Sequence, residues 1–120
     1  MARQDLSAAK KRWWTTVRLL RLLLPPNDER KVRVRLDKSG PDDCLGDCIQ
    51  RSDHYLIRIH PDLFRRNRGV AYLVLAHEWA HARAWNDEID HGDKWGMEMA
   101  RCWRLIIGEF AGGDWNGLVD

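Results

Sequence analysis

The chain has 120 residues, which is room for one compact domain, and a domain of this size can bury a core without disulfide bonds. An apolar share of 44% excludes a disordered chain, and 32% charged residues indicate a well-solvated surface. The net charge of +2 is unevenly distributed, because residues 1–38 carry 11 Lys or Arg and 4 Asp or Glu (net +7), whereas residues 39–120 carry 9 and 14 (net −5).

The first predicted element is an amphipathic helix over residues 6–24, where apolar residues recur at spacings of three and four. Two prolines, Pro25 and Pro26, end it. Residues 1–29 are basic, and the polar side of this helix can follow a DNA backbone without sequence preference. On charge alone, a solvated helix face is the simpler explanation. The cations on that side are Lys10, Lys11, Arg12, Arg18 and Arg21.

Three short strands are expected next. Charged and apolar residues alternate over residues 31–37 and 54–60, and a third strand is predicted between them at residues 44–50. We expect the three to form a small antiparallel sheet. The strand at 54–60 lies just upstream of the helix predicted over residues 68–85. An edge strand in that place can pair with an extended peptide.

Three cysteines, Cys44, Cys48 and Cys102, are an odd number, and no secretory signal precedes them. This usage predicts reduced thiols and a cytoplasmic protein. Cys44 and Cys48 lack a second cysteine pair with which to bind zinc, so we expect buried thiols rather than a second metal site. The apolar run at residues 19–24 is interrupted by Arg21 and is too short to span a membrane.

The second half of the chain is predicted to be mainly helical. A brief helical turn at residues 61–66 precedes a helix over 68–85 that is apolar nearly all round, as is typical of a helix in the middle of a core. A polar loop, a last helix over 94–110 and a glycine-rich, irregular tail over 111–120 complete the chain. The expected fold is a single α+β domain over residues 1–120, with an N-terminal helix, a three-stranded sheet, a central helix and a C-terminal packing helix.

The central helix contains the segment HEWAH, residues 77–81. His77 and His81 are four residues apart and therefore lie on one helix face, where two imidazoles can bind one metal ion. A catalytic zinc site uses three protein ligands and leaves a fourth position open. Glu78 is then the expected general base, which takes a proton from water and later gives it to the departing amine. The alternative is a pair of core histidines satisfied by hydrogen bonds.

The third ligand is sought downstream. Ala84 and Asp87 occupy the positions where the metzincin pattern requires Gly and His, which excludes that class. We favour His91, because Gly92 gives the backbone freedom to bring the imidazole back. Glu98 on the last helix, or a carboxylate in the loop, is the alternative. Asp90 can instead hold one of the imidazoles in place.

These residues resemble the SprT-like zinc metallopeptidases, in which HExxH is followed by a His-Gly-x-x-(Phe or Trp) element that opens the next helix. Here that element runs from His91 and Gly92 to Trp95. The order of helices and strands is also similar, and the chain resembles short stand-alone members such as those carried by bacteriophages. The resemblance implies zinc bound by His77, His81 and His91, a catalytic Glu78 and a protein substrate. The best-known members remove proteins crosslinked to DNA, but the zinc ribbon or DNA-binding region that often follows is not found in this sequence.

The sequence therefore predicts a zinc-dependent metalloendopeptidase that acts on a protein or peptide. The alternative is a non-catalytic domain that uses zinc for structure or that binds DNA as an accessory. Glu78 separates the two, since a structural site has no use for it. Candidates for holding the oxyanion are Tyr72, His54 and His60, and Trp79 and Trp95 are expected to be core residues.

Overall fold

The computed structural model describes residues 6–37, 44–87 and 89–111. The elements in chain order are α1 (Ser7–Leu23), β1 (Lys31–Leu36), β2 (Gly46–Gln50), β3 (His54–Ile59), α2 (Pro61–Arg66), α3 (Arg68–Arg83) and α4 (Asp93–Ala111). Each element was predicted with bounds that differ by no more than two residues, and the α+β class is confirmed. Helix α4 includes the first residue of the predicted tail, and the rest of that tail lies outside the described residues.

The sheet has the order β1-β3-β2, so β3 is the central strand. Strands β2 and β3 are antiparallel, with Gly46 opposite Ile59, whereas β1 and β3 are parallel, with Lys31 opposite His54. The prediction of an antiparallel sheet is therefore wrong for β1, and the prediction that strand 54–60 is an edge strand is wrong as well. The short link at residues 51–53 allows only an antiparallel neighbour, while residues 37–53 are long enough for a crossover to a parallel one.

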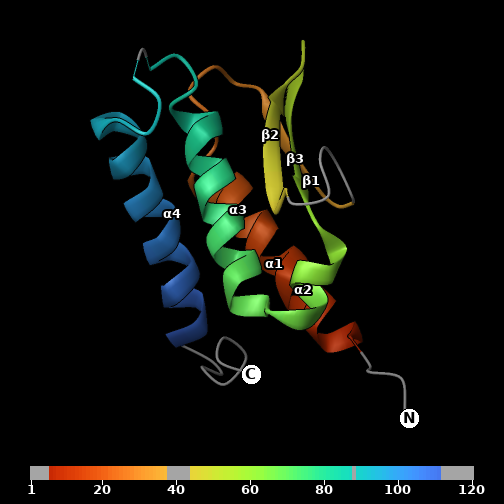
Figure 1. Ribbon diagram of the computed structural model, residues 1–120. Coiled ribbons are helices and arrows are strands. Elements are labelled where there is room, and N and C mark those ends of the chain that lie inside the picture. Colours follow the sequence, from red (N-terminus) through yellow and green to blue (C-terminus); the bar gives the residue numbers. More distant parts are fainter. Residues whose placement is uncertain (1–5, 38–43, 88, 112–120) are drawn as a thin grey trace.

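Helices α1 and α3 cover one face of the sheet, and α4 packs on α3 from the side away from the sheet (Figure 1). The alternation of β1 follows from this layering, since Val32 and Val34 are buried against the helices while Lys31, Arg33 and Arg35 are exposed. Helix α3 is buried nearly all round, as predicted. The largest fully buried side chains of this core are Trp13, Trp79, Tyr55, Tyr72 and Phe64.

The site is positioned by the close approach of β2 to α3. A Cβ atom on Gly46 would lie 2.7 Å from Cγ1 of Val74 and 2.9 Å from the carbonyl oxygen of Arg58. Any side chain at this position would therefore push the strand away from the helix. Five residues further along α3, the indole Nε1 of Trp79 donates to the carbonyl of Leu24 at 2.8 Å, which ties the helix to the end of α1. Within the described ranges, no helix is long and apolar enough to cross a membrane.

Candidate metal centre

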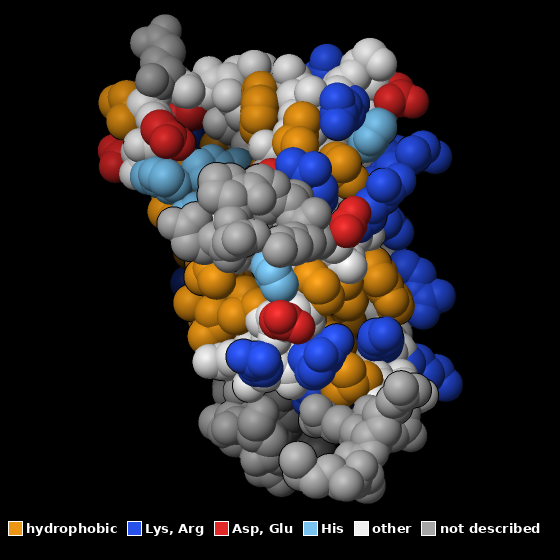
Figure 2. All heavy atoms as spheres, turned by 45° about the vertical axis from the view of Figure 1, so that its right-hand side comes forward, with side chains coloured by type: hydrophobic (Ala, Val, Ile, Leu, Met, Phe, Trp, Pro, Cys, Tyr) orange, Lys and Arg blue, Asp and Glu red, His pale blue; other side chains and the backbone are white. Residues whose placement is uncertain are grey.

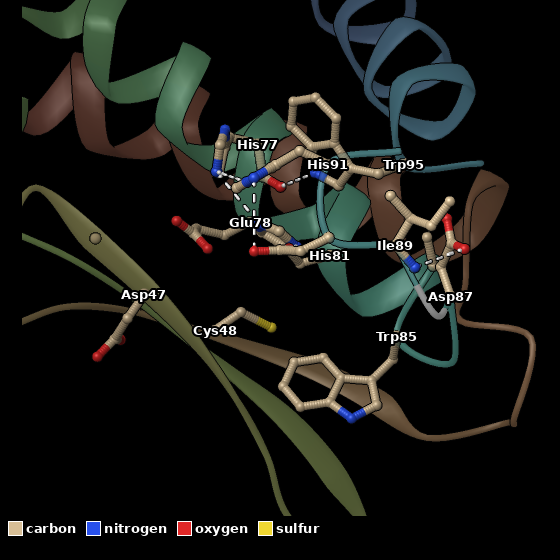
Figure 3. A pocket seen from close by; sticks show the side chains of 13 residues that line it. Asp47, Cys48, His77, Glu78, His81, Trp85, Asp87, Ile89, His91 and Trp95 are labelled. Carbon is tan, nitrogen blue, oxygen red and sulfur yellow. Dashed lines mark hydrogen bonds and ion pairs between the residues drawn. The ribbon is translucent and has the colours of Figure 1, made fainter. Parts of the chain in front are cut away.

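Three histidines converge between α3 and the loop that precedes α4. Nε2 of His77 lies 3.2 Å from Nε2 of His81 and 3.3 Å from Nε2 of His91 (Figure 3). The ligand atoms of the three residues all lie within 4.8 Å of one another. Two nitrogens that bind zinc tetrahedrally at 2.0–2.1 Å are roughly 3.3–3.4 Å apart. The two measured spacings therefore fit a zinc ion.

Hydrogen bonding alone does not explain this arrangement. Nε2 of His77 faces two other imidazole nitrogens, yet it has only one site, which either donates a proton or accepts one. In a metal-free cluster of the three histidines, one of these two contacts would thus remain unsatisfied. A cation at the centre satisfies all three nitrogens at once, so the donor set fits a metal better than it fits a hydrogen-bonded cluster.

The environment favours the neutral form of the two helix-borne imidazoles. Burial lowers the pKa of His77, and the nearby His91 lowers it further. Burial likewise lowers the pKa of His81, with added contributions from His77 and His91, while Asp90 acts in the opposite direction on both. The neutral imidazole is the form that binds a metal ion, so both shifts favour metal binding.

His91 reaches the cluster through an unusual backbone conformation. Its φ is 56°, in the left-handed region, where residues other than glycine are uncommon. The turn is closed by the amide of Gly92, which donates to the carbonyl of Ile89 at 3.2 Å. A Cβ on Gly92 would lie 2.9 Å from Cβ and Cγ2 of Ile89, so the glycine is needed for space. The unusual backbone conformation that was expected at Gly92 is therefore found at His91 instead.

The competing ligand Glu98 is held elsewhere. Its side chain is buried, and its two carboxylate oxygens pair with the guanidinium groups of Arg83 and Arg101. Arg83 also donates to the carbonyl of Pro25, so this group joins α3, α4 and the end of α1. Among the loop carboxylates, Asp87 accepts from the amide of Ile89 at 3.4 Å, and residue 88 lies outside the described residues.

Glu78 lies beside the histidines and is 8% exposed. Burial raises its pKa to about 7, and the charge of Asp47 on β2 adds to the effect. Figure 3 shows the Glu78 carboxylate on the side of the cluster that faces β2, where Cys48 also points toward the histidines. Burial, followed by the charges of Glu78 and Asp47, raises the pKa of Cys48 to about 12.

These groups line an open cavity of about 500 Å³. Its walls come from β2, from α3 with the loop that follows, and from the start of α4. The lining residues are Gly46, Asp47, Cys48, His77, Glu78, His81, Ala84, Trp85, Asp87, Ile89, Asp90, His91 and Trp95. Among the described residues, no Lys or Arg lines this cavity. The β2 residues had no sequence signal, because only the tertiary packing of α3 on the sheet brings them here.

The expectation that Trp95 is a core residue is wrong, because the side chain is half-buried and lines the cavity beside the histidines. Its ring centroid lies 5.0 Å from that of His77, 5.7 Å from His81 and 4.7 Å from His91. Its Nε1 donates to the backbone carbonyl of His77 at 3.3 Å. In the sequence, Trp95 could be recognised from its position four residues after His91. Trp79, in contrast, is fully buried in the core as predicted.

The three oxyanion candidates do not line the cavity. Tyr72 is buried against Trp13, with ring centroids 4.8 Å apart. Nδ1 of His60 accepts from a backbone amide at the start of α2, and His54 pairs with the neighbouring Asp53 on the surface.

The sequence was compared with known families, curated proteins and solved structures. The sequence model of the SprT-like family matches residues 16–110, a range that extends from α1 into α4 and includes every residue of the histidine cluster. Neither a curated protein nor a solved structure matches the chain. Because the family match covers well over half of the sequence, the chain belongs to the SprT-like family.

Proposed function

We propose that this protein is a zinc-dependent metalloendopeptidase. The observation that carries the proposal is the convergence of three imidazole Nε2 atoms next to a buried glutamate in an open cavity. Membership of the SprT-like family supports a zinc metallopeptidase-like role.

In this proposal His77, His81 and His91 hold the metal through Nε2. When bound, zinc supplies Lewis-acid activation of water and of the peptide carbonyl. Glu78 accepts the proton of the attacking water and delivers it to the departing amine. Trp95 and the buried side of α3 keep the three imidazoles in register, because a reacting geometry tolerates little displacement.

The cavity suits an extended polypeptide. Strand β2 is an edge strand in the described sheet, and Gly46, Asp47 and Cys48 bring it to the cavity wall. The backbone of a peptide can pair with such an edge. In this proposal β2 is the edge strand that pairs with the substrate, a role that the sequence analysis gave to residues 54–60. Trp85 and Ile89 are 37% and 67% exposed at the cavity and offer apolar contacts to substrate side chains.

A purely structural zinc site accounts less well for Glu78. Its carboxyl group is buried, and no Lys or Arg lines the same cavity among the described residues. A buried carboxylate costs free energy unless a cation compensates it, so a side chain without a function would not be expected at this position. A metal ion together with a role in proton transfer explains the residue.

The proposed function is tested with a denatured protein as substrate. The zinc-loaded protein is incubated with it, with and without single-stranded DNA, and the products are analysed by mass spectrometry. We expect internal cleavage that stops when a chelator removes the metal and returns when zinc is restored. Intact substrate in every zinc-loaded sample would contradict the proposal.

We further propose that the protein contacts DNA without sequence preference. The predicted cations of α1 are exposed, although the guanidinium Nε of Arg21 is engaged by the carbonyl of Val32 at 2.8 Å. Strand β1 adds a second basic row, because Lys31, Arg33 and Arg35 all lie on its exposed face. Lys and Arg side chains gather along one edge of the face shown in Figure 2. Alternate strand residues are about 6.6 Å apart, so the β1 row can follow a chain of phosphates.

Salt dependence tests this contact. We expect binding of single-stranded DNA to weaken as salt increases, and the slope to become shallower when Lys31, Arg33 and Arg35 are replaced by Gln. The same replacement of Lys10, Lys11 and Arg12 compares α1 with β1. If both triple variants bind like the wild type, neither surface contacts DNA.

A further inference from the structure

Asp90 is the one loop carboxylate in the described residues that faces two of the clustered histidines. The Nε2 atoms of the cluster point inward, so the Nδ1 atoms of His81 and His91 are left on the outside. Oδ1 of Asp90 lies 3.8 Å from Nδ1 of His81, and Oδ2 lies 3.6 Å from Nδ1 of His91. Each carboxylate oxygen thus faces a different imidazole.

The two contacts have different origins. Asp90 is the chain neighbour of His91, and closeness to that residue needs no special explanation. His81, however, is nine residues away on α3, and the loop must fold back to bring the carboxylate to its Nδ1. Asp87 in the same loop does not do this, since its Oδ1 accepts from the amide of Ile89.

We propose that Asp90 is a positioning residue that orients His81 and His91 together, through their Nδ1 atoms. This inference rests on the metal site of the proposed function. A carboxylate that accepts from Nδ1–H fixes the tautomer in which Nε2 keeps its lone pair for the metal, and it makes the imidazole a stronger ligand. By serving two ligands, Asp90 links the helix-borne half of the cluster to the loop-borne half.

The size of the effect follows from exposure. The side chain of Asp90 is 79% exposed, and both distances are longer than a direct hydrogen bond. The contact is then made through water or by a small movement of the loop. Loss of an outer partner of this kind lowers metal affinity about 10–100-fold, and the exposure places Asp90 at the lower end, about tenfold.

Metal affinity tests the inference without reference to catalysis. Zinc binding is measured by competition with a chromophoric chelator for the wild type, Asp90→Asn, Asp90→Glu and Asp53→Asn. Asp53 is a matched control, because it is 76% exposed and pairs with His54, which lies outside the cluster. Cobalt-substituted samples add the visible absorption spectrum, and the melting temperature of the metal-free proteins reports on folding.

We expect Asp90→Asn to weaken zinc binding about tenfold and to alter the cobalt spectrum, with no change in the metal-free melting temperature. Asp90→Glu should recover most of the affinity, and Asp53→Asn should bind like the wild type. If Asp90→Asn binds zinc within twofold of the wild type, or if Asp53→Asn loses as much, Asp90 does not position the ligands. A wild type that binds zinc but cleaves no protein would overturn the proposed function alone, and a wild type that binds no zinc would overturn both.

Discussion

The two halves of the metal centre are built in different ways. His77, Glu78 and His81 come from one buried helix, whose period sets their relative positions. His91 comes from a loop, and its place depends on a left-handed backbone and on contacts with Trp95 and Asp90. The helix half is therefore fixed by the core, whereas the loop half must be held by its own neighbours. Substitutions should separate these two kinds of support.

The largest effect is expected at the loop ligand. His91→Ala removes one of three imidazoles and leaves a pair of histidines on α3, so zinc affinity should fall by more than the 10–100-fold typical of an outer partner. The helical content should stay the same, since His91 is exposed and lies outside the helices. Isothermal titration with zinc and circular dichroism measure the two quantities. Zinc binding equal to that of the wild type would exclude His91 as a ligand.

Glu98→Ala should show the opposite pattern. The substitution leaves the guanidinium of Arg83, which is 12% exposed, without its buried partner, at a cost of about 3 kcal/mol in the free energy of unfolding. Zinc should still bind at about one ion per chain. Urea unfolding and metal analysis provide the test, and loss of zinc from the folded variant would mean that Glu98 is the third ligand.

Gly46→Ala probes the approach of β2 to α3. The new methyl group would lie 2.7 Å from Cγ1 of Val74 and 2.9 Å from a backbone oxygen, so we expect a loss of about 1–3 kcal/mol in the free energy of unfolding. Gly108→Ala on α4 is the control, since nothing lies within 4 Å of its Cβ position. It should stabilise the protein by about 0.5–1 kcal/mol. A neutral Gly46→Ala would show that the strand does not lie this close to the helix.

Trp95→Phe should have the smallest effect. The ring that packs on the imidazoles is kept in part, but the bond from Nε1 to the carbonyl of His77 is lost, which is worth about 1 kcal/mol. Quenching of tryptophan fluorescence by bound cobalt should also fall, because Trp95 lies next to all three histidines. Unchanged quenching would place the metal away from this ring.

The same contrast explains how much the sequence could predict. The helix half follows from spacing alone, because four residues make about one turn and both imidazoles must share a face. The order of elements and the resemblance carried by His91, Gly92 and Trp95 were also readable. The left-handed conformation of His91 could not be predicted from the sequence, because it depends on the position of the other two histidines on α3.

The sheet shows the same limit. Alternation predicted each strand, but the parallel pairing of β1 with β3 depends on how a crossover packs, and no local pattern records it. That pairing makes β2 an edge strand and brings Cys48 to the cavity, so the wall opposite the histidines could not be predicted from the sequence.

The central claim is tested most directly by Glu78→Gln. The variant removes the group that transfers protons and leaves all three imidazoles in place, so it should bind about one zinc per chain, as the wild type does. We expect the wild type to cleave a denatured protein and the variant to leave it intact at the same zinc occupancy. Cleavage by Glu78→Gln at the wild-type rate would contradict the account.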